Sequence, residues 1–310
     1  MGRTGATGAC VNKNEIHGLW LGLLGVVLFS ITLPVTRMAV GTPETPFLSG
    51  YFIAFGRAGV AGLLSAVYLY LVKAVPPSFK QCQSLAMVSL GVVFGFPLLT
   101  SLAMRYLPAA HASVITGVLP LATAALAARV NRQRPSIGFW FCAVGGCLLV
   151  LCFAILRSGQ SGWWPQTADL MLLGAMAMAA IGYVWGGRMS MDMPAQHVIS
   201  WGLVLSLPLS LPMAWLHQPV DPVPWSAWAG FTYVSLFSMW LGFFAWYRGL
   251  ALGGTVRVSQ VQLLQPFLGM LFAIPILGET LDAMTVGFGL AVVAIVFIGR
   301  KMPLHSTSKD

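Results

Sequence analysis

The chain has 310 residues, of which 57% are hydrophobic and only 8% are charged, and its formal net charge at pH 7 is +9. Charged residues make up about 25% of ordinary soluble domains, so a soluble fold of this length could not cover its surface. The composition therefore excludes a soluble protein and indicates a chain embedded in membrane lipid. The basic residues lie at the ends of apolar segments, so we expect no nucleic-acid partner.

Ten apolar segments follow one another along the chain, each near the roughly 20 residues that a helix needs to cross a bilayer. We place them at about residues 17–40, 48–73, 84–104, 109–129, 136–156, 168–189, 197–216, 226–248, 254–277 and 283–299. Proline-containing connections separate them, and no interval is long enough for a soluble domain. We therefore predict an all-α integral membrane protein with ten transmembrane helices and tails at 1–16 and 300–310. Nine spans are the alternative, because adjacent boundaries shift by several residues.

The basic residues also predict the orientation of the chain. With the N-terminus in the cytoplasm, twelve of the 17 lysines and arginines lie on the inner side and three on the outer side, while Arg57 and Arg257 lie within spans. This bias follows the positive-inside rule. We expect both termini to be cytoplasmic, in a multi-pass protein of the inner membrane.

One polar pattern occurs twice, 146 residues apart, inside membrane-length segments. The first copy contains His111, Ser113, Thr116 and Pro120, and the second contains Arg257, Ser259, Gln262 and Pro266. Each copy has a basic residue, a serine two positions later and a proline nine positions later. Five spans separate the copies, so they are inserted in opposite orientations. This predicts two inverted five-helix repeats at 17–156 and 168–299, an arrangement that secondary transporters use.

Residues 246–280, from Trp246-Tyr-Arg-Gly to Gly278-Glu279-Thr280, carry a family resemblance. They resemble the EamA-type members of the drug/metabolite transporter superfamily, and Arg57 matches an arginine typical of the second helix of that family. The resemblance covers about residues 17–300 and implies ten helices in two five-helix repeats. The first repeat departs from the pattern, because Arg132-Gln133 stands where the second repeat has Gly278-Glu279.

The two prolines predict kinked helices that face protein or water, because each removes a backbone hydrogen bond that lipid cannot replace. Ser113, Thr116 and Pro120 fall at i, i+3 and i+7, on one helix face, and Ser259, Gln262 and Pro266 have the same spacing. Two such faces from inverted copies would line one central cavity. The predicted substrate-binding residues are Gln262, Gln265, Ser259, Thr116, Ser113, Arg57, Trp240 and Tyr183, with helix kinks at Pro120 and Pro266. The alternative is that these polar groups hold helices together.

Two basic residues allow more than one interpretation. Arg57 lies deep in the second span, where a charge costs at least about 2.5–3.5 kcal/mol. It is either a docking point for a substrate carboxylate or a structural cation, and its presence in relatives with different cargo favours the structural role. His111 lies near a span end, within reach of the interface, and its pKa range also makes it a candidate for proton coupling.

None of the eight acidic residues falls in the middle of a span, which argues against proton-coupled antiport of cations. The five cysteines lack CxxC spacing, and no enzyme motif is present, so we expect no metal, no cofactor and no catalytic activity. The favoured function is a secondary transporter, a monomer or homodimer, that exports a small metabolite such as an amino acid. An importer or facilitator of similar cargo, a non-transporting scaffold and an intramembrane enzyme are the alternatives.

Overall fold

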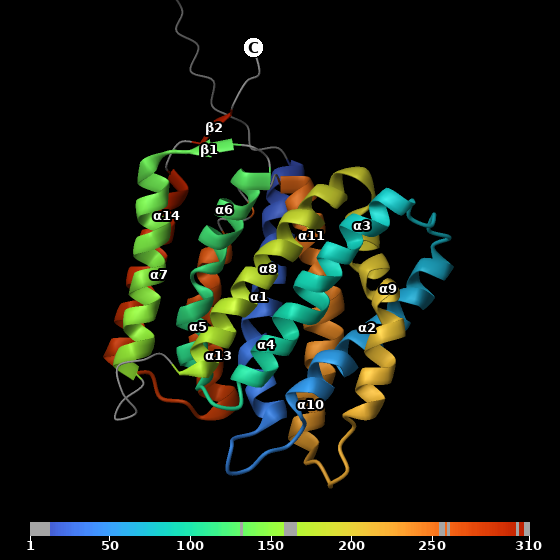
Figure 1. Ribbon diagram of the computed structural model, residues 1–310, viewed down its shortest axis with the longest axis horizontal. Coiled ribbons are helices and arrows are strands. Elements are labelled where there is room, and N and C mark those ends of the chain that lie inside the picture. The colour runs from blue at the N-terminus through green and yellow to red at the C-terminus, as the bar shows by residue number, and fades with distance from the viewer. Residues whose placement is uncertain are drawn as a thin grey trace, which may run out of the picture.

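The computed structural model describes residues 13–130, 133–157, 166–253, 258, 261–301 and 304–306, which form a helical bundle (Figure 1). The first half contains α1 (Lys13–Val40), α2 (Gly50–Leu71), α3 (Phe79–Val88), η1 (Ser89–Gly95), α4 (Phe96–Ala103), α5 (Ala109–Thr116), α6 (Leu119–Val130) and α7 (Ile137–Arg157). The second half contains α8 (Thr167–Asp192), α9 (Ala195–Leu216), α10 (Trp225–Tyr233), η3 (Val234–Leu241), α11 (Gly242–Gly253), η4 (Gln262–Leu264), α13 (Gln265–Leu277) and α14 (Ala283–Lys301).

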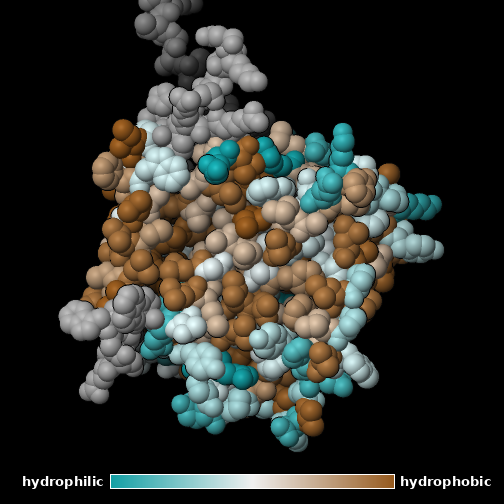
Figure 2. Space-filling model, viewed as in Figure 1, coloured by the Kyte–Doolittle hydropathy of each residue, from teal (hydrophilic) through white to brown (hydrophobic). Residues whose placement is uncertain are grey.

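Eight helices among the described residues are long and apolar enough to cross a membrane, and two further apolar helices, Gln262–Leu277 and Ala283–Gly299, are shorter. The chain is therefore a multi-pass membrane protein. The ninth predicted span begins at residue 254, and 254–257 and 259–260 lie outside the described residues. Figure 2 shows hydrophobic residues over the middle of one face and hydrophilic residues toward its two ends, as a bilayer requires.

The third apolar helix begins earlier than its hydropathy predicted, at Phe79 instead of residue 84. Ser78 precedes it, and the Ser78 side chain accepts a hydrogen bond from the Gln81 backbone N–H while the Gln81 side chain accepts one from the Ser78 N–H. This capping box satisfies N–H groups that the start of a helix otherwise leaves free. The helix therefore extends beyond its apolar stretch.

A short antiparallel pair of strands was not predicted. Strand β1 (Gln133–Pro135) follows α6, and β2 (Leu304–Ser306) lies in the predicted C-terminal tail. Both segments leave the bundle at the same end, at the top of Figure 1, so their backbone groups can pair with each other.

Corresponding helices of the two halves, the third and the eighth, each contain a π-helical segment. In η1 the Phe96 N–H bonds to the Gly91 carbonyl, and in η3 the Gly242 N–H bonds to the Phe237 carbonyl, each five residues back. Pro97 follows η1 and lacks an N–H, which favours a broken α-helical pattern there. No proline follows η3, and nothing in its sequence explains the distortion. Such segments occur frequently at functional sites.

The fourth and ninth helices are interrupted close to the repeated prolines. α5 ends at Thr116 and α6 begins at Leu119, next to Pro120. In the second half the 3₁₀ turn η4 leads into α13 at Gln265, next to Pro266. In both places the chain uses shorter-range hydrogen bonds before the proline, including one from the Gly117 N–H to the Val114 carbonyl.

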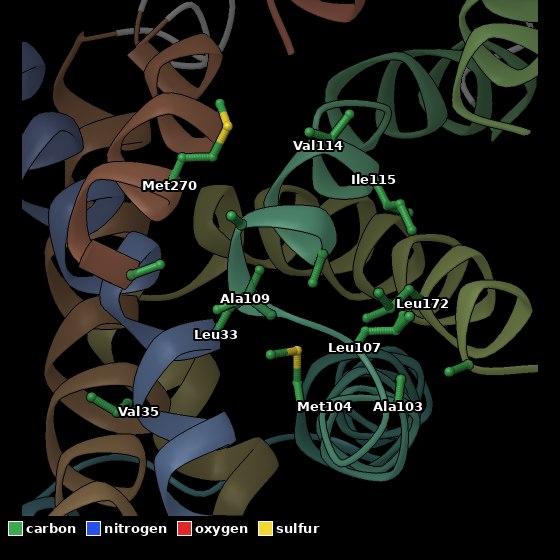
Figure 3. Packing of buried hydrophobic residues seen from close by; sticks show 14 of the residues in the cluster. Leu33, Val35, Ala103, Met104, Leu107, Ala109, Val114, Ile115, Leu172 and Met270 are labelled. Atoms are coloured by element: carbon green, nitrogen blue, oxygen red, sulfur yellow. The ribbon is translucent and has the colours of Figure 1, made fainter. Parts of the chain in front are cut away.

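The largest buried apolar cluster surrounds α5, where side chains from α1, α4, α8 and α13 meet (Figure 3). Val114 and Ile115 of α5 are fully buried. A second cluster joins α1, α2, α9 and α11. Elsewhere η1 lies against α8 so closely that a Cβ on Gly91 would stand 2.4 Å from the backbone nitrogen of Gly182. Glycine at these positions therefore permits the contact.

Candidate functional site

Helices from both halves surround a cavity in the middle of the bundle. The cavity is narrow in this conformation, and about 440 Å³ is reached only by counting every gap between its lining atoms together with space open to solvent. The lining residues are Phe29 and Thr32 (α1), Arg57 (α2), Val92 (η1), Phe96 (α4), Thr116 (α5), Leu119 (α6), Met176, Ala179 and Tyr183 (α8), Ser238 (η3), Phe243 (α11) and Gln265 (α13). Both π-helical segments and both interrupted helices thus contribute to its wall.

Arg57 is the charged residue of this lining, and its side chain is buried. Ser49 begins α2 by accepting a hydrogen bond from the Phe52 N–H, so Arg57 comes two turns into the helix. The Arg57 Nη2 donates to the Ser238 hydroxyl at 2.8 Å, and Arg57 Nε has no partner. Thr32 also donates to the Ser238 hydroxyl, at 2.8 Å. Arg57, Thr32 and Ser238 therefore form one buried polar group from three helices.

Aromatic rings form much of the remaining wall. The rings of Phe29 and Phe243 lie 5.0 Å apart, and the rings of Tyr183 and Phe243 lie 6.2 Å apart. Phe96 and Met176 complete this apolar surface. A pocket with few polar groups on an apolar wall is typical of small-molecule sites.

The structure brings some of the predicted site residues together and leaves others apart. Arg57, Tyr183, Thr116 and Gln265 line the cavity, whereas Ser113, Gln262 and Trp240 are absent from its lining. Ser259 lies outside the described residues. Trp240 packs against Tyr68 and Phe244 instead. The role of all these residues in substrate binding stays a prediction.

The two copies of the repeated pattern have different hydrogen bonds. In the first copy the Ser113 hydroxyl donates to the Ala109 carbonyl at 2.8 Å, and the Thr116 hydroxyl donates to the Ser113 carbonyl at 2.7 Å. In the second copy Gln262 is buried and its Nε2 has no partner. The first copy thus satisfies its own hydroxyls, while the second retains a free amide donor.

Sequence reasoning missed Ser238, which bonds to the Arg57 side chain, and Thr32, which bonds to Ser238. Both are polar residues inside strongly apolar spans, and each has a second serine two or three positions away. That polarity is the signal that could have found them. It does not tell which face of a helix turns toward Arg57.

A second polar group, which we call the α5 terminal cluster, lies at the start of α5 and consists of Ala109, Ala110, His111, Asp169 and the partly buried Glu279. The two carboxylate oxygens of Glu279 accept hydrogen bonds from the N–H groups of Ala109 and Ala110, at 2.7 and 2.8 Å. Gly278 makes this possible, because it ends α13 in the left-handed conformation with φ +68°. A carboxylate is favourable at a helix N-terminus, which carries partial positive charge.

His111 also belongs to the α5 terminal cluster, near the start of its helix as expected, but its side chain is enclosed by protein instead of reaching the interface. It is buried, and its Nε2 lies 2.7 Å from Oδ1 of Asp169 at the start of α8. The other oxygen of Asp169 accepts a hydrogen bond from the Gln166 N–H at 3.1 Å. The sequence placed Asp169 only at a span end, because hydropathy does not show that α8 packs beside α5.

A metal site finds no support within the described ranges, which contain no group of three or more His, Cys, Asp or Glu side chains suited to hold an ion.

Comparisons with known proteins place the chain in a family. The model of the EamA-like transporter family matches residues 16–155 and 166–300. The chain is 41% identical over 294 residues to the uncharacterized transporter YdeK of Bacillus subtilis (strain 168), covering 93% of this chain and 99% of that protein. It is 21% identical over 304 residues to the uncharacterized transporter YyaM of the same organism, covering 94% and 97%.

A solved crystal structure has a similar fold, with a TM-score of 0.63 and 16% sequence identity over 92% of this chain and 96% of that chain. At this identity the likeness shows the fold alone. The family match extends over both halves of the chain and agrees with the resemblance seen in the sequence. The chain therefore belongs to the EamA-like transporter family, within the drug/metabolite transporter superfamily.

Proposed function

We propose that this protein is a secondary transporter that exports a small neutral or zwitterionic metabolite, such as an amino acid, across the cytoplasmic membrane. One observation carries the proposal: helices from both halves enclose a cavity that combines Arg57, Thr32, Ser238 and Gln265 with aromatic rings. Secondary transporters place their substrate at the interface of such halves, near the middle of the bilayer. The direction of export rests on the family resemblance alone.

Alternating access is the proposed mechanism. We infer ten spans, with α13 and α14 belonging to the ninth and tenth, and two inverted halves that rock around the cavity. An even number of spans agrees with both termini in the cytoplasm, which the positive-inside bias favours. The interrupted helices and the π-helical segments beside the cavity supply places where the backbone can rearrange without unfolding a whole span.

The test begins with thermal unfolding of the purified full-length protein in detergent, against a library of amino acids and other small metabolites. A molecule that binds the folded state raises the midpoint as its concentration exceeds its dissociation constant. We expect at least one such molecule to cross the membrane of liposomes that contain the protein. Empty liposomes and the Arg57→Gln variant are the controls.

A matched variant on the same helix separates loss of the site from general damage. Val67 lies on α2, is 58% exposed and does not line the cavity, so Val67→Ala should transport as the wild type does. If every bound molecule fails to cross, a non-transporting role replaces the proposal. Inward accumulation against a gradient would instead favour an importer.

A further inference from the structure

We propose that the cavity recognises a carboxylate, held by Arg57, so that the substrate is a small metabolite with one carboxylate on an apolar body, whether an amino acid or a simple carboxylate. This inference rests on the proposed transport function and names the chemical group that positions the cargo. It is drawn from the hydrogen bonds and charges that surround Arg57.

The polar group around Arg57 has more donors than acceptors. A guanidinium carries five N–H donors, and the bond that Arg57 makes goes to the Ser238 oxygen, while Nε has no partner. The Ser238 and Thr32 hydroxyls lie 2.8 Å apart, and Thr32 also reaches the Leu28 carbonyl at 3.4 Å, so this hydroxyl pair has partners for its own hydrogens. The excess of donors therefore lies on the guanidinium itself. Buried donors of this kind require an acceptor, which an occupant of the cavity would supply.

The charge of Arg57 has no counter-ion within the described chain. Its bonding partner is a neutral hydroxyl, and no acidic residue lines the cavity. By contrast, the buried His111 has Asp169 at 2.7 Å. A buried cation is costly unless it is paired, so the charge at Arg57 favours an anion in the adjoining space.

A carboxylate fits this site better than a phosphate does. The planar guanidinium can donate two parallel hydrogen bonds to a carboxylate, and the single negative charge balances the single positive charge of Arg57. A phosphate monoester carries about −1.5 to −2 charges at pH 7 and three acceptor oxygens, and the lining offers no second cation. The phosphate would therefore remain partly uncompensated.

The remaining lining determines the rest of the ligand. Phe29, Phe96, Met176 and Phe243 present apolar surface, which suits a branched aliphatic or aromatic side chain. The ammonium group of an amino acid would find only amide, hydroxyl and carbonyl oxygens, because no carboxylate lines the cavity. The carboxylate, and not the ammonium group, is therefore the feature on which binding depends.

The experiment compares matched ligands on the purified full-length protein. Propanoate, 3-methylbutanoate and 3-phenylpropanoate are each tested beside the corresponding primary amide, by thermal shift and by titration calorimetry, with 3-methylbutyl phosphate as the competing anion. We expect a carboxylate to bind roughly 10- to 100-fold more tightly than its amide. Arg57→Gln should remove this preference, while Val67→Ala should preserve it.

Each outcome bears on the proposal. The proposal is supported if a carboxylate binds more tightly than its amide only when Arg57 is present. Equal binding within every pair, no binding by any carboxylate, or tighter binding of the phosphate ester overturns it. The wild-type comparison decides the matter even where Arg57→Gln does not fold. If an amine or amide is transported by liposomes while no carboxylate binds, this inference fails and the transport function stands; if no molecule is transported, the transport function itself fails.

Discussion

The polar groups at the start of α5 and in the cavity differ in whether the protein itself supplies partners for their hydrogen-bonding atoms. In the α5 terminal cluster, His111 has Asp169 as partner and Glu279 caps two backbone N–H groups. In the cavity, Arg57 has only the Ser238 hydroxyl and keeps an Nε without a partner. The protein supplies hydrogen-bond partners for the side chains of the first group, whereas Arg57 keeps donors without partners.

This difference separates a structural role from a binding role. A buried histidine–aspartate contact with further hydrogen bonds can hold three elements, α5, α8 and the end of α13, in one arrangement. An uncompensated cation beside a cavity destabilises the empty protein and favours a ligand that neutralises it. Each group contains a buried basic side chain, so burial alone does not distinguish their roles. The presence of a partner does.

The largest expected effect is at the α5 terminal cluster. Asp169→Leu should lower the free energy of unfolding by about 1–3 kcal/mol, because a ring nitrogen of His111 is left buried without its partner. Chemical unfolding in detergent measures this. The double variant His111→Leu/Asp169→Leu should recover part of the loss, since it leaves neither polar side chain without its partner. Simple addition of the two single losses would contradict the pairing.

The Glu279 cap should contribute less. Glu279→Gln retains the shape but removes the charge that faces the α5 N-terminus, and should cost about 0.5–2 kcal/mol of unfolding free energy. Asp221 is exposed in a loop and makes the control, so Asp221→Asn should be neutral. Equal losses for both variants would indicate a general effect of charge.

Arg57 provides the contrasting variant. Arg57→Gln should leave the unfolding free energy unchanged or raise it by up to about 1 kcal/mol, because it removes a buried charge that has no counter-ion. The same variant should abolish substrate-dependent thermal stabilisation. A strong loss of folded protein would instead place Arg57 with the structural group.

The smallest perturbation compares the two copies of the repeated pattern. In a background without native cysteines, Gln265→Cys should react with a small water-soluble thiol reagent and be protected by substrate, because Gln265 lines the cavity. Ser113→Cys should stay inert, since Ser113 is fully buried beside its own helix backbone. Gln262→Cys tests a buried position that does not line the cavity in this structure. Its labelling would show that the cavity opens further along α13 and η4 than in this conformation.

Part of the candidate site was accessible from the sequence. Arg57, Thr116, Gln265 and Tyr183 were predicted and line one cavity, because polar or charged residues inside apolar spans must turn toward protein or water. Trp240 was predicted, like Tyr183, because it is an aromatic residue in the middle of a span, but it packs among other rings. An aromatic ring is stable in either environment, so its type alone does not place it.

Other features required the packing of distant segments. Ser238 meets Arg57 from 181 positions away, and Asp169 meets His111 from 58 positions away. No local pattern indicates which helix faces meet. The sequence of η3 also shows no sign of its π-helical form, because a hydrogen-bond pattern shifted by one residue leaves hydropathy unchanged.

The sequence by itself determined the membrane class, the order of the apolar segments and the duplicated pattern, since hydropathy and repetition are properties of neighbouring residues. Only the tertiary structure decided which charges are paired and which are left open. That depends on contacts between helices far apart in the chain, whose rotation is set by packing. His111 and Arg57 illustrate the point: both are basic residues in apolar spans, and only their neighbours in space separate them.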